Sequence, residues 1–186
     1  MYDKLQAGRI LQGDILEDFK FEFVGIEDDS EIKNTINFPY ITILTQDCDL
    51  EQDFSQRKIP KGEQRNQDKY IHSVLIAPMF VSDALKTGGH LQDLDVKMES
   101  WASDLWKPIK QNHNERFHYF PEDVNFNMPS LVIDFKHFYT VGRDEVYRVF
   151  EGNYKVSIKV PYRELLSHRF SNYLSRIAVE EIASHP

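Results

Sequence analysis

The chain has 186 residues, of which 41% are hydrophobic and 13% aromatic, and its formal net charge is −8. This length suits one folded domain, and the apolar content is sufficient for a core, which excludes a disordered chain. The single cysteine excludes an internal disulfide and a cysteine-rich zinc site, and the acidic balance disfavours non-specific attraction to nucleic acid.

The beginning of the chain, residues 1–6, lacks the apolar core of a signal peptide. No later run approaches the roughly 20 apolar residues that a membrane-spanning helix needs. We therefore predict a single domain over residues 1–186 that is located in the cytoplasm and makes no membrane contact.

The first predicted strand lies between Gly8 and Phe23. Gly13-Asp14 is a turn signal, and the apolar residues Phe19, Phe21 and Phe23 then alternate with polar ones. This alternation predicts a strand with one buried face. Residues 27–37 are polar and acidic, and we expect them to form a loop that leads to the central strand.

The stretch from Phe38 to Asp53 passes from an apolar segment into a group of carboxylates around the only cysteine. Residues 40–45 are rich in β-branched and aromatic side chains, which predicts a buried strand that begins after Pro39. Catalytic chemistry would be expected at the end of this strand. The best catalytic candidates are Asp47, Cys48 and Asp49.

Two interpretations of these candidates remain open. At an extended strand end, Asp47 and Asp49 would project to one side and could hold a hard metal ion together with Asp14 or His72. In a turn, one aspartate would instead accept hydrogen bonds from local backbone amides, and Cys48 would be a small buried side chain. We favour the turn and predict neither a metal ion nor a cofactor.

Residues 51–69 show almost no hydrophobic periodicity and are rich in Gln, Arg, Lys, Gly and Pro. This composition predicts a mobile loop. Because long loops without structure are often functional, the basic side chains are candidates for contacts to nucleic acid or another anion. The candidates are Arg57, Lys58, Lys61 and Arg65.

Residues 70–80 form a second apolar run, which we expect to be a strand beside residues 40–45 and to end at Pro78. A helical insertion is predicted over residues 82–112. It would contain a short helix that Ser82 caps and Gly88-Gly89 closes, and a second helix over residues 91–106 that ends at Pro108. His113 and His118 follow without a companion cysteine, so they do not indicate a metal site.

The last third of the chain is predicted to contain three strands and a helix. The strands cover residues 131–141, 146–150 and 156–160, with a hairpin turn at 142–145 between the first two. Pro161 then opens an amphipathic helix over residues 162–178, whose apolar stripe we expect to cover the sheet.

The strand order resembles that of the PemK/MazF family of toxin ribonucleases. The similar segments are Gly13-Asp14-Ile15, the run from Pro39 to Asp47, residues 74–78 and residues 131–141. The resemblance implies an SH3-like β-barrel, dimers, and either RNA cleavage or pairing with an antitoxin. The expected fold class is therefore mainly β with added helices (α+β), a barrel enlarged by the helical insertion and closed by the C-terminal helix.

The chain departs from that family at both catalytic positions. An arginine precedes the proline in the family, whereas Asn37 and Phe38 stand here, and acidic residues replace the threonine or serine after the strand. Arg57 or Arg65, with Ser55, could take these roles from the loop. Two functions follow as expectations. The first is an RNA-binding or endoribonuclease-like protein of a bacterial toxin-antitoxin or phage-defence system. The second is a non-catalytic interaction module in such a system, acting as a homodimer or with a protein partner.

Overall fold

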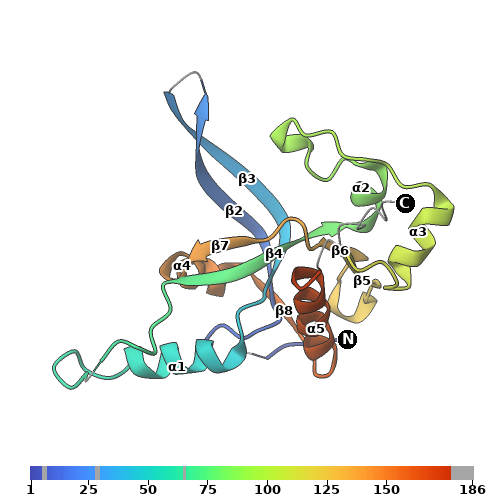
Figure 1. Cartoon of the computed structure of the whole chain (residues 1–186). Helices are drawn as coiled ribbons and strands as arrows, with labels where there is room; N and C mark the ends of the chain where they lie inside the picture. The colour runs from blue at the N-terminus through green and yellow to red at the C-terminus, as the bar shows by residue number, and fades with distance from the viewer. Residues whose placement is uncertain (6–7, 28–29, 65, 177–186) are drawn as a thin grey trace, which may run out of the picture.

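One antiparallel sheet of eight strands forms the centre of the computed structural model, which describes residues 1–5, 8–27, 30–64 and 66–176 (Figure 1). Neighbouring strands follow the order β1-β8-β2-β3-β4-β6-β5, and β7 also pairs with β4. The strands are β1 (Tyr2–Asp3), β2 (Asp14–Glu27), β3 (Ser30–Ile43), β4 (Ser73–Val81), β5 (Phe117–Phe120), β6 (Leu131–Asp134), β7 (Tyr139–Gly142) and β8 (Tyr154–Ile158).

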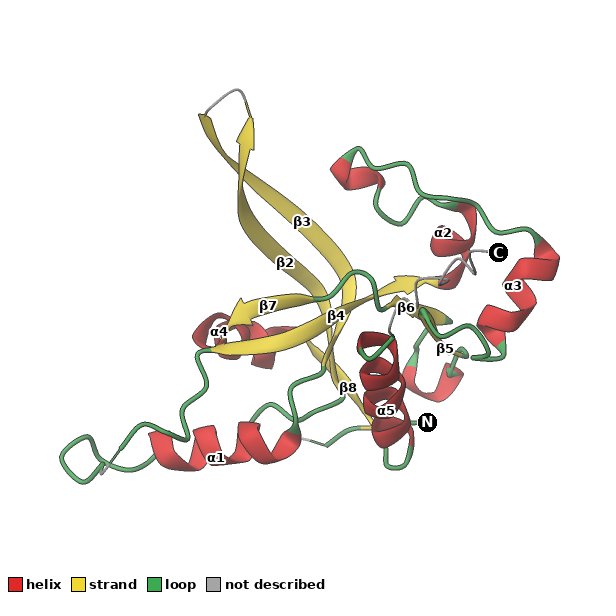
Figure 2. Cartoon of the chain, in the orientation of Figure 1, coloured by secondary structure: helices red, strands yellow, loops and turns green. Residues whose placement is uncertain are grey.

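The helices lie between and after these strands (Figure 2). They are α1 (Asp47–Arg57), α2 (Ser82–Thr87), α3 (Ser103–Lys110), α4 (Arg143–Asn153) and α5 (Tyr162–Leu174), together with the short 3-10 turns η1 (Gln92–Leu94) and η2 (Val124–Phe126). The α+β class is thus confirmed. Within the described residues, no helix is both long and apolar enough to cross a lipid bilayer.

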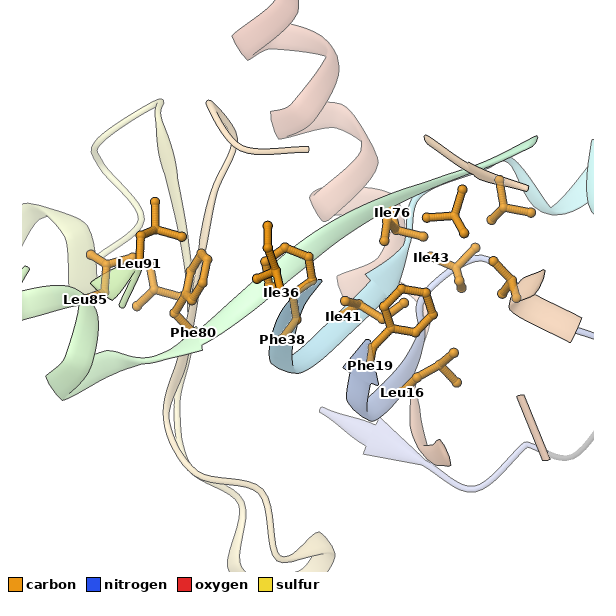
Figure 3. Packing of buried hydrophobic residues seen from close by; sticks show 14 of the residues in the cluster. Leu16, Phe19, Ile36, Phe38, Ile41, Ile43, Ile76, Phe80, Leu85 and Leu91 are labelled. Atoms are coloured by element: carbon orange, nitrogen blue, oxygen red, sulfur yellow. The ribbon is translucent and has the colours of Figure 1, made fainter. Parts of the chain in front are cut away.

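The central strand β4 is buried on both faces, which explains its continuous apolar run. Val74, Ile76 and Phe80 belong to one hydrophobic cluster, while Ala77 and Met79 belong to another, as the alternation of side chains along a strand requires. Helices α1 to α4 all contribute to the first cluster, and α5 covers the second. Figure 3 shows Leu85 of α2 together with strand residues of the first cluster. Each large side chain that is fully buried in this way contributes about 1.5–3 kcal/mol.

The predicted closed barrel is wrong, because the sheet is open. Its two edge strands approach each other, because the ring of Tyr2 in β1 stacks on Phe120 in β5 with centroids 6.4 Å apart. No backbone pairing joins these two strands within the described residues. β1 pairs only with β8 and β5 only with β6 in the described part of the chain, so the sheet remains open between them.

The expected loop over residues 27–37 is instead largely strand. β2 and β3 are each 14 residues long and pair as a hairpin that projects from the body of the molecule (Figure 1). Ile36 and Phe38 are buried while the intervening Asn37 is exposed. This alternation is present in the sequence, but Asn34, a polar residue at one of the alternate positions, obscures it.

The strand predicted over residues 146–150 is a helix, α4. Gly142 ends β7, and Asp144 and Glu145 occupy the first helical turn, where negative charge interacts favourably with the helix dipole. Val146 is fully buried one turn further on. The β-branched and aromatic residues misled the prediction because tertiary packing overrides such preferences.

The strand predicted over residues 131–141 is divided into β6 and β7, which lie one after the other along the same edge of β4. Met79 pairs with Ile133 and Ile76 pairs with Tyr139, so the edge segment has three more residues than β4 over this distance. The extra residues leave the sheet between the two strands. Pro78 lies inside β4 rather than at its end.

The helical insertion is confirmed in position but not in its second helix. α2 ends at Gly88, whose positive φ of 77° suits glycine, as predicted. The second helix covers only residues 103–110 and contains Pro108, because the apolar residues 91–101 form η1 and extended chain instead. Ser82 does not cap α2, since its hydroxyl hydrogen-bonds that of Ser130 at 2.6 Å.

The remaining predictions near the C-terminus are largely confirmed. β8 covers most of the predicted third strand, and β3 pairs with β4 from Tyr40 to Ile43. The C-terminal helix is present and ends at Leu174. Residues 177 and 178, which the prediction included in this helix, lie outside the described residues.

Candidate functional site

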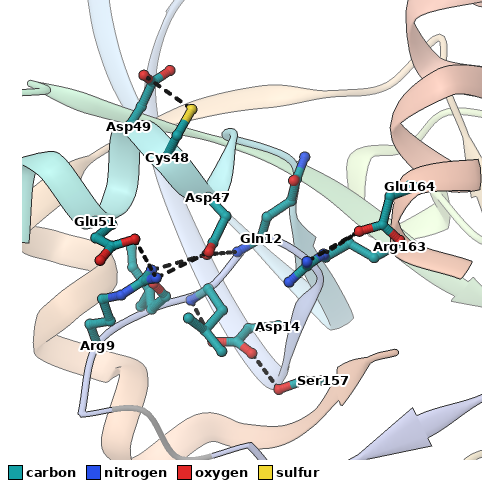
Figure 4. Close-up of polar contacts among 12 residues, drawn as sticks. Arg9, Gln12, Asp14, Asp47, Cys48, Asp49, Glu51, Ser157, Arg163 and Glu164 are labelled. Carbon is teal, nitrogen blue, oxygen red and sulfur yellow. Dashed lines mark hydrogen bonds and ion pairs between the residues drawn. The ribbon is translucent and has the colours of Figure 1, made fainter. Parts of the chain in front are cut away.

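The acidic candidates lie at the beginning of α1, not on a strand (Figure 4). Asp47 and Asp49 occupy the first helical turn, where their charges favour the helix dipole. Since successive residues on an α-helix turn by about 100°, two positions separated by one residue point to nearly opposite sides. The alternative interpretation, in which both carboxylates face one side, is therefore wrong.

Asp47 is held by Arg9. The guanidinium donates from Nη1 to Oδ1 and from Nη2 to Oδ2, both at 3.0 Å, and the backbone N–H of Gln12 donates to Oδ1 at 3.3 Å. Partial burial would raise the pKa of Asp47, but the hydrogen bonds and charge of Arg9 outweigh it and lower the pKa. Asp47 therefore remains an ionised structural partner at neutral pH and is poorly suited to exchange protons.

Gln12 connects this ion pair to the C-terminal helix. Its side-chain amide donates to the carbonyl oxygen of Leu44 at 3.2 Å and to the hydroxyl of Ser167 at 2.8 Å. The beginning of α1, the end of β3 and the middle of α5 thus meet at one polar junction. These contacts indicate that the junction has a structural role and holds the three elements together.

Asp14 lies beside this junction and is fully buried. Its carboxylate accepts hydrogen bonds from the Ser157 hydroxyl at 2.5 Å and from the backbone N–H of Leu11 at 2.8 Å. Burial raises the pKa of Asp14 to about 7, although both hydrogen bonds oppose the shift. Because this carboxyl has no exposed surface, a metal ion or substrate cannot reach it from solvent.

Cys48 is exposed, so the expectation of a small buried side chain is wrong. Its sulfur lies 3.7 Å from Gln46 Oε1 and 3.7 Å from Asp49 Oδ1. Among the described residues, this sulfur has no imidazole contact of the kind that activates the nucleophilic cysteine in many hydrolases. Within the described part of the chain, no group of three or more His, Cys, Asp or Glu side chains is placed to hold a metal ion, so the proposed Asp14 or His72 site is not formed.

The expected mobile loop is partly helix, because α1 continues to Arg57. Its apolar periodicity is weak because one of its two buried residues is a carboxylate, Asp53, and the other is Leu50. Asp53 accepts hydrogen bonds from Arg57 Nε and Arg143 Nε, both at 2.7 Å, and from the Ile71 backbone N–H at 3.1 Å. This carboxylate therefore fixes α1 to the beginnings of α4 and β4.

Neither Ser55 nor Arg57 reaches Asp47. Eight helical residues separate Ser55 from Asp47, which corresponds to about 12 Å along the axis of α1. Arg57 is bound to Asp53 and also lies over the ring of Tyr70, with its carbon Cζ 4.5 Å from the centroid. Among the residues that the structure describes, Ser55 and Arg57 therefore do not form a toxin-type catalytic pair at the acidic segment.

The structure does bring most of the predicted anion contacts together. Arg57, Lys58 and Lys61 line one hollow of about 660 Å³ at the C-terminal end of α1. Its other lining residues are Ile59, Pro60, Gln64, Gln67 and Tyr70. We call this hollow the basic pocket. Arg65, the fourth candidate, lies outside the described residues.

His118, one of the histidines that did not indicate a metal site, belongs to the core. It is 3% exposed and its ring contacts that of Phe120, with centroids 4.6 Å apart. Burial, together with the charge of Arg169, lowers the pKa of His118 to about 3. The imidazole is therefore neutral at physiological pH.

Sequence analysis missed the partners of the candidate residues. Arg9 lies 38 positions before Asp47, and Arg143 lies 90 positions after Asp53. No local pattern in the sequence marks such pairs.

A scan of protein-family models and searches of curated proteins and of solved structures found no match to this chain. The PemK/MazF relationship therefore remains a prediction.

Proposed function

We propose that the chain is a binding module that holds single-stranded RNA at the basic pocket and does not cleave it at Asp47–Asp49. The observation that carries this proposal is the convergence of three cationic side chains, two amides and one tyrosine around a single hollow. Surfaces that bind single-stranded nucleic acid usually combine cationic side chains along the path of the phosphate backbone with aromatic rings on which bases stack.

The members of the pocket would contribute differently. Lys58 and Lys61 are exposed, so their charges are available to phosphates. The charge of Arg57 is already compensated by Asp53, so this residue would mainly position Tyr70, on whose ring it lies. We therefore expect the two lysines to dominate the electrostatic part of binding.

Salt dependence offers a quantitative test. Each phosphate that a lysine neutralises on a single strand changes the slope of log K against log salt by about −0.7, so the two lysines account for about −1.4. We expect the double variant Lys58→Gln/Lys61→Gln to bind a 5′-hydroxyl oligouridine more weakly and with a slope reduced by that amount. Fluorescence anisotropy between 50 and 300 mM KCl, concentrations of the order at which such slopes are usually measured, provides the data.

A matched variant, Lys86→Gln/Lys107→Gln, removes the same charge from α2 and α3 and should leave the slope unchanged. Equal slopes for the parent and the Lys58/Lys61 variant would refute the proposal, as would the absence of any salt-sensitive binding by the parent. Cleavage of the RNA by the parent protein, with or without Mg²⁺, would instead support the endoribonuclease alternative.

The β2–β3 hairpin favours a second function, a protein-interaction module. Residues 17–33 contain seven acidic and two basic residues, and beyond the region paired with β8 and β4 the two strands pair only with each other. Such an arm would repel nucleic acid and suit a partner with a basic surface. The double variant Glu22→Lys/Glu31→Lys should lose a protein that co-purifies with the parent in low salt. Retention of that protein by the variant would contradict this function.

The predicted homodimer and the toxin-antitoxin or phage-defence setting rest on the family resemblance and remain predictions. Of the two functions, RNA binding is favoured because the basic pocket combines charge, amides and an aromatic ring in one place.

A further inference from the structure

A second polar hollow lies at the opposite side of the molecule, between the α2–α3 connection and the strands β5 and β6. Its volume is about 200 Å³. The lining residues are Leu85, His90, Lys97, Met98, Glu99, Trp101, Arg116, Phe117, Asp134 and Lys136. We call it the histidine pocket. Figure 1 shows α1, which bears the basic pocket, far from α2 and α3.

His90 provides an unusual feature of this pocket. Both ring nitrogens are buried, and neither has a hydrogen-bond partner among the residues that the structure describes. The ring is held in place by an edge contact to Phe80, with centroids 4.7 Å apart. Buried polar groups of this kind are normally satisfied by protein, water or a ligand. A ligand atom in the hollow would satisfy one of them.

The pocket also has a rigid cationic wall. Arg116 forms two hydrogen bonds to the buried carboxylate of Asp134, with Nε donating to Oδ1 at 2.8 Å and Nη2 donating to Oδ2. The backbone N–H of Lys136 also donates to Oδ1 at 3.0 Å. His137 lies next to this pair, with its Nε2 3.7 Å from Asp134 Oδ2. The carboxylate thus accepts three hydrogen bonds and fixes the guanidinium in one orientation.

The charges around the hollow favour an anion. Lys97, Arg116 and Lys136 are cationic, and the carboxylates of Glu99 and Asp134 compensate two of these charges, which leaves one net positive charge. Lys97 and Lys136 are exposed, so their flexible ammonium groups can reach a ligand. Burial lowers the pKa of His90, with Asp134 opposing and the charges of His137 and Arg116 adding to the shift. The imidazole is therefore neutral at neutral pH and can donate one N–H.

The volume limits the size of the ligand. At about 30 Å³ for each water in the liquid, the hollow has room for roughly six waters. This space accommodates a phosphate group, whereas ligand sites for larger molecules usually have about 300 Å³ or more. Two lysines, an oriented arginine and an imidazole donor also match the several oxygens and double charge of such a group.

We propose that the histidine pocket binds a phosphate group with three free oxygens, either inorganic phosphate or the end of a phosphomonoester. Arg116 and the imidazole of His90 contact the oxygens, and Lys97 and Lys136 compensate the charge. This inference does not depend on RNA binding at the basic pocket, because the two pockets share no residue.

The test uses the full chain and three probes at constant ionic strength, adjusted with NaCl. The probes are inorganic phosphate, a short 5′-phosphorylated RNA and the same RNA with a 5′-hydroxyl group. Binding is followed by calorimetry and by the ¹⁵N signals of the His90 ring. We expect phosphate to shift these ring signals, and each lost charged contact to weaken binding by about tenfold.

Three variants make the test specific. Lys97→Gln/Lys136→Gln alters only exposed side chains and should weaken phosphate binding by about a hundredfold, as expected for two such contacts. His90→Gln should also weaken it. Lys58→Gln/Lys61→Gln, in the basic pocket, should leave phosphate affinity unchanged.

Tighter binding of the 5′-phosphorylated RNA than of either other probe assigns the site to a phosphomonoester end, and binding of inorganic phosphate alone assigns it to the free ion. Both results support the proposal. Absence of phosphate binding, unchanged ring signals of His90, or equal affinity in the Lys97/Lys136 variant and the parent overturns it. If RNA does not bind at the basic pocket, the Lys58/Lys61 variant and the parent will show the same salt dependence of RNA binding. That result leaves the phosphate-binding measurements at the histidine pocket unaffected.

Discussion

Replacement of Asp53 by alanine tests whether a buried carboxylate fixes α1 to the sheet. The parent side chain is 1% exposed and accepts two charged hydrogen bonds of 2.7 Å, from Arg57 and Arg143, and one from the Ile71 backbone. The variant removes all three acceptor contacts at once. It leaves two guanidinium groups beside an apolar methyl group, and Arg143 is only 13% exposed.

The loss of stability follows from these exposures. Removing one member of a buried ion pair costs about 3–5 kcal/mol. Arg57 is 30% exposed and can be hydrated, and Arg143 keeps its contact to Asp144, so we expect the lower end, about 3 kcal/mol. With a urea m-value of about 2 kcal/mol/M, the midpoint would fall by about 1.5 M. The melting temperature would fall by about 6–12 °C for a chain of this size.

Urea unfolding followed by tryptophan fluorescence and circular dichroism measures this change. Asp144→Ala is the matched control, because it removes an 84% exposed partner of the same Arg143 at 2.8 Å. Exposed pairs contribute about 0–1 kcal/mol, so the control midpoint should move little. If Asp53→Ala lost no more stability than Asp144→Ala, the conclusion that Asp53 anchors α1 would be refuted.

Two further predictions concern single residues. Burial raises the pKa of Asp14 to about 7, whereas the ordinary pKa of this side chain is 3.8. The native state therefore binds more protons than the unfolded state between these pH values, and stability falls as pH rises through them. In Asp14→Asn this slope should disappear, so the stability of the variant should rise relative to that of the parent by roughly 2–4 kcal/mol between pH 4 and 7. Unfolding experiments at several pH values measure this difference. Parallel pH profiles of the two proteins would contradict the prediction. Gly88→Ala should lower the free energy of unfolding by at least about 2 kcal/mol, because φ at this position is 77° and the added Cβ meets the carbonyl group of Met98. Gly152→Ala is the control, because nothing lies within 4 Å of a Cβ added there. Equal melting temperatures for the two variants would contradict the argument.

The local pattern of the sequence was sufficient for several elements. The apolar runs around Ile41 and Ile76 predicted two neighbouring buried strands, and the pairing of β3 with β4 confirms them. The glycine pair at position 88 marked the end of α2, and the helix after Pro161 was present. In each case, side-chain periodicity and backbone preference point to the same structure over a few residues.

Tertiary contacts decided the elements whose local pattern was ambiguous. α4 has the β-branched and aromatic residues of a strand but packs Val146 into the core as a helix. The sequence of α1 predicted a loop because its buried side holds a carboxylate, Asp53. The contact of Asp53 with Arg143 forms only in the folded chain. The open sheet was also not predictable, since closure depends on whether the short edge strands β1 and β5 pair.

The candidate site shows the same division. The sequence by itself indicated which residues carry charge, and three of the four predicted anion contacts line one pocket. It could not indicate that Arg9 neutralises Asp47, or that His90 faces the same hollow as Arg116 and Asp134. These residues are distant in the chain and become neighbours only because the sheet brings its strands together. Long-range proximity is a property of the whole fold, whereas periodicity and turn preference are properties of a few adjacent residues.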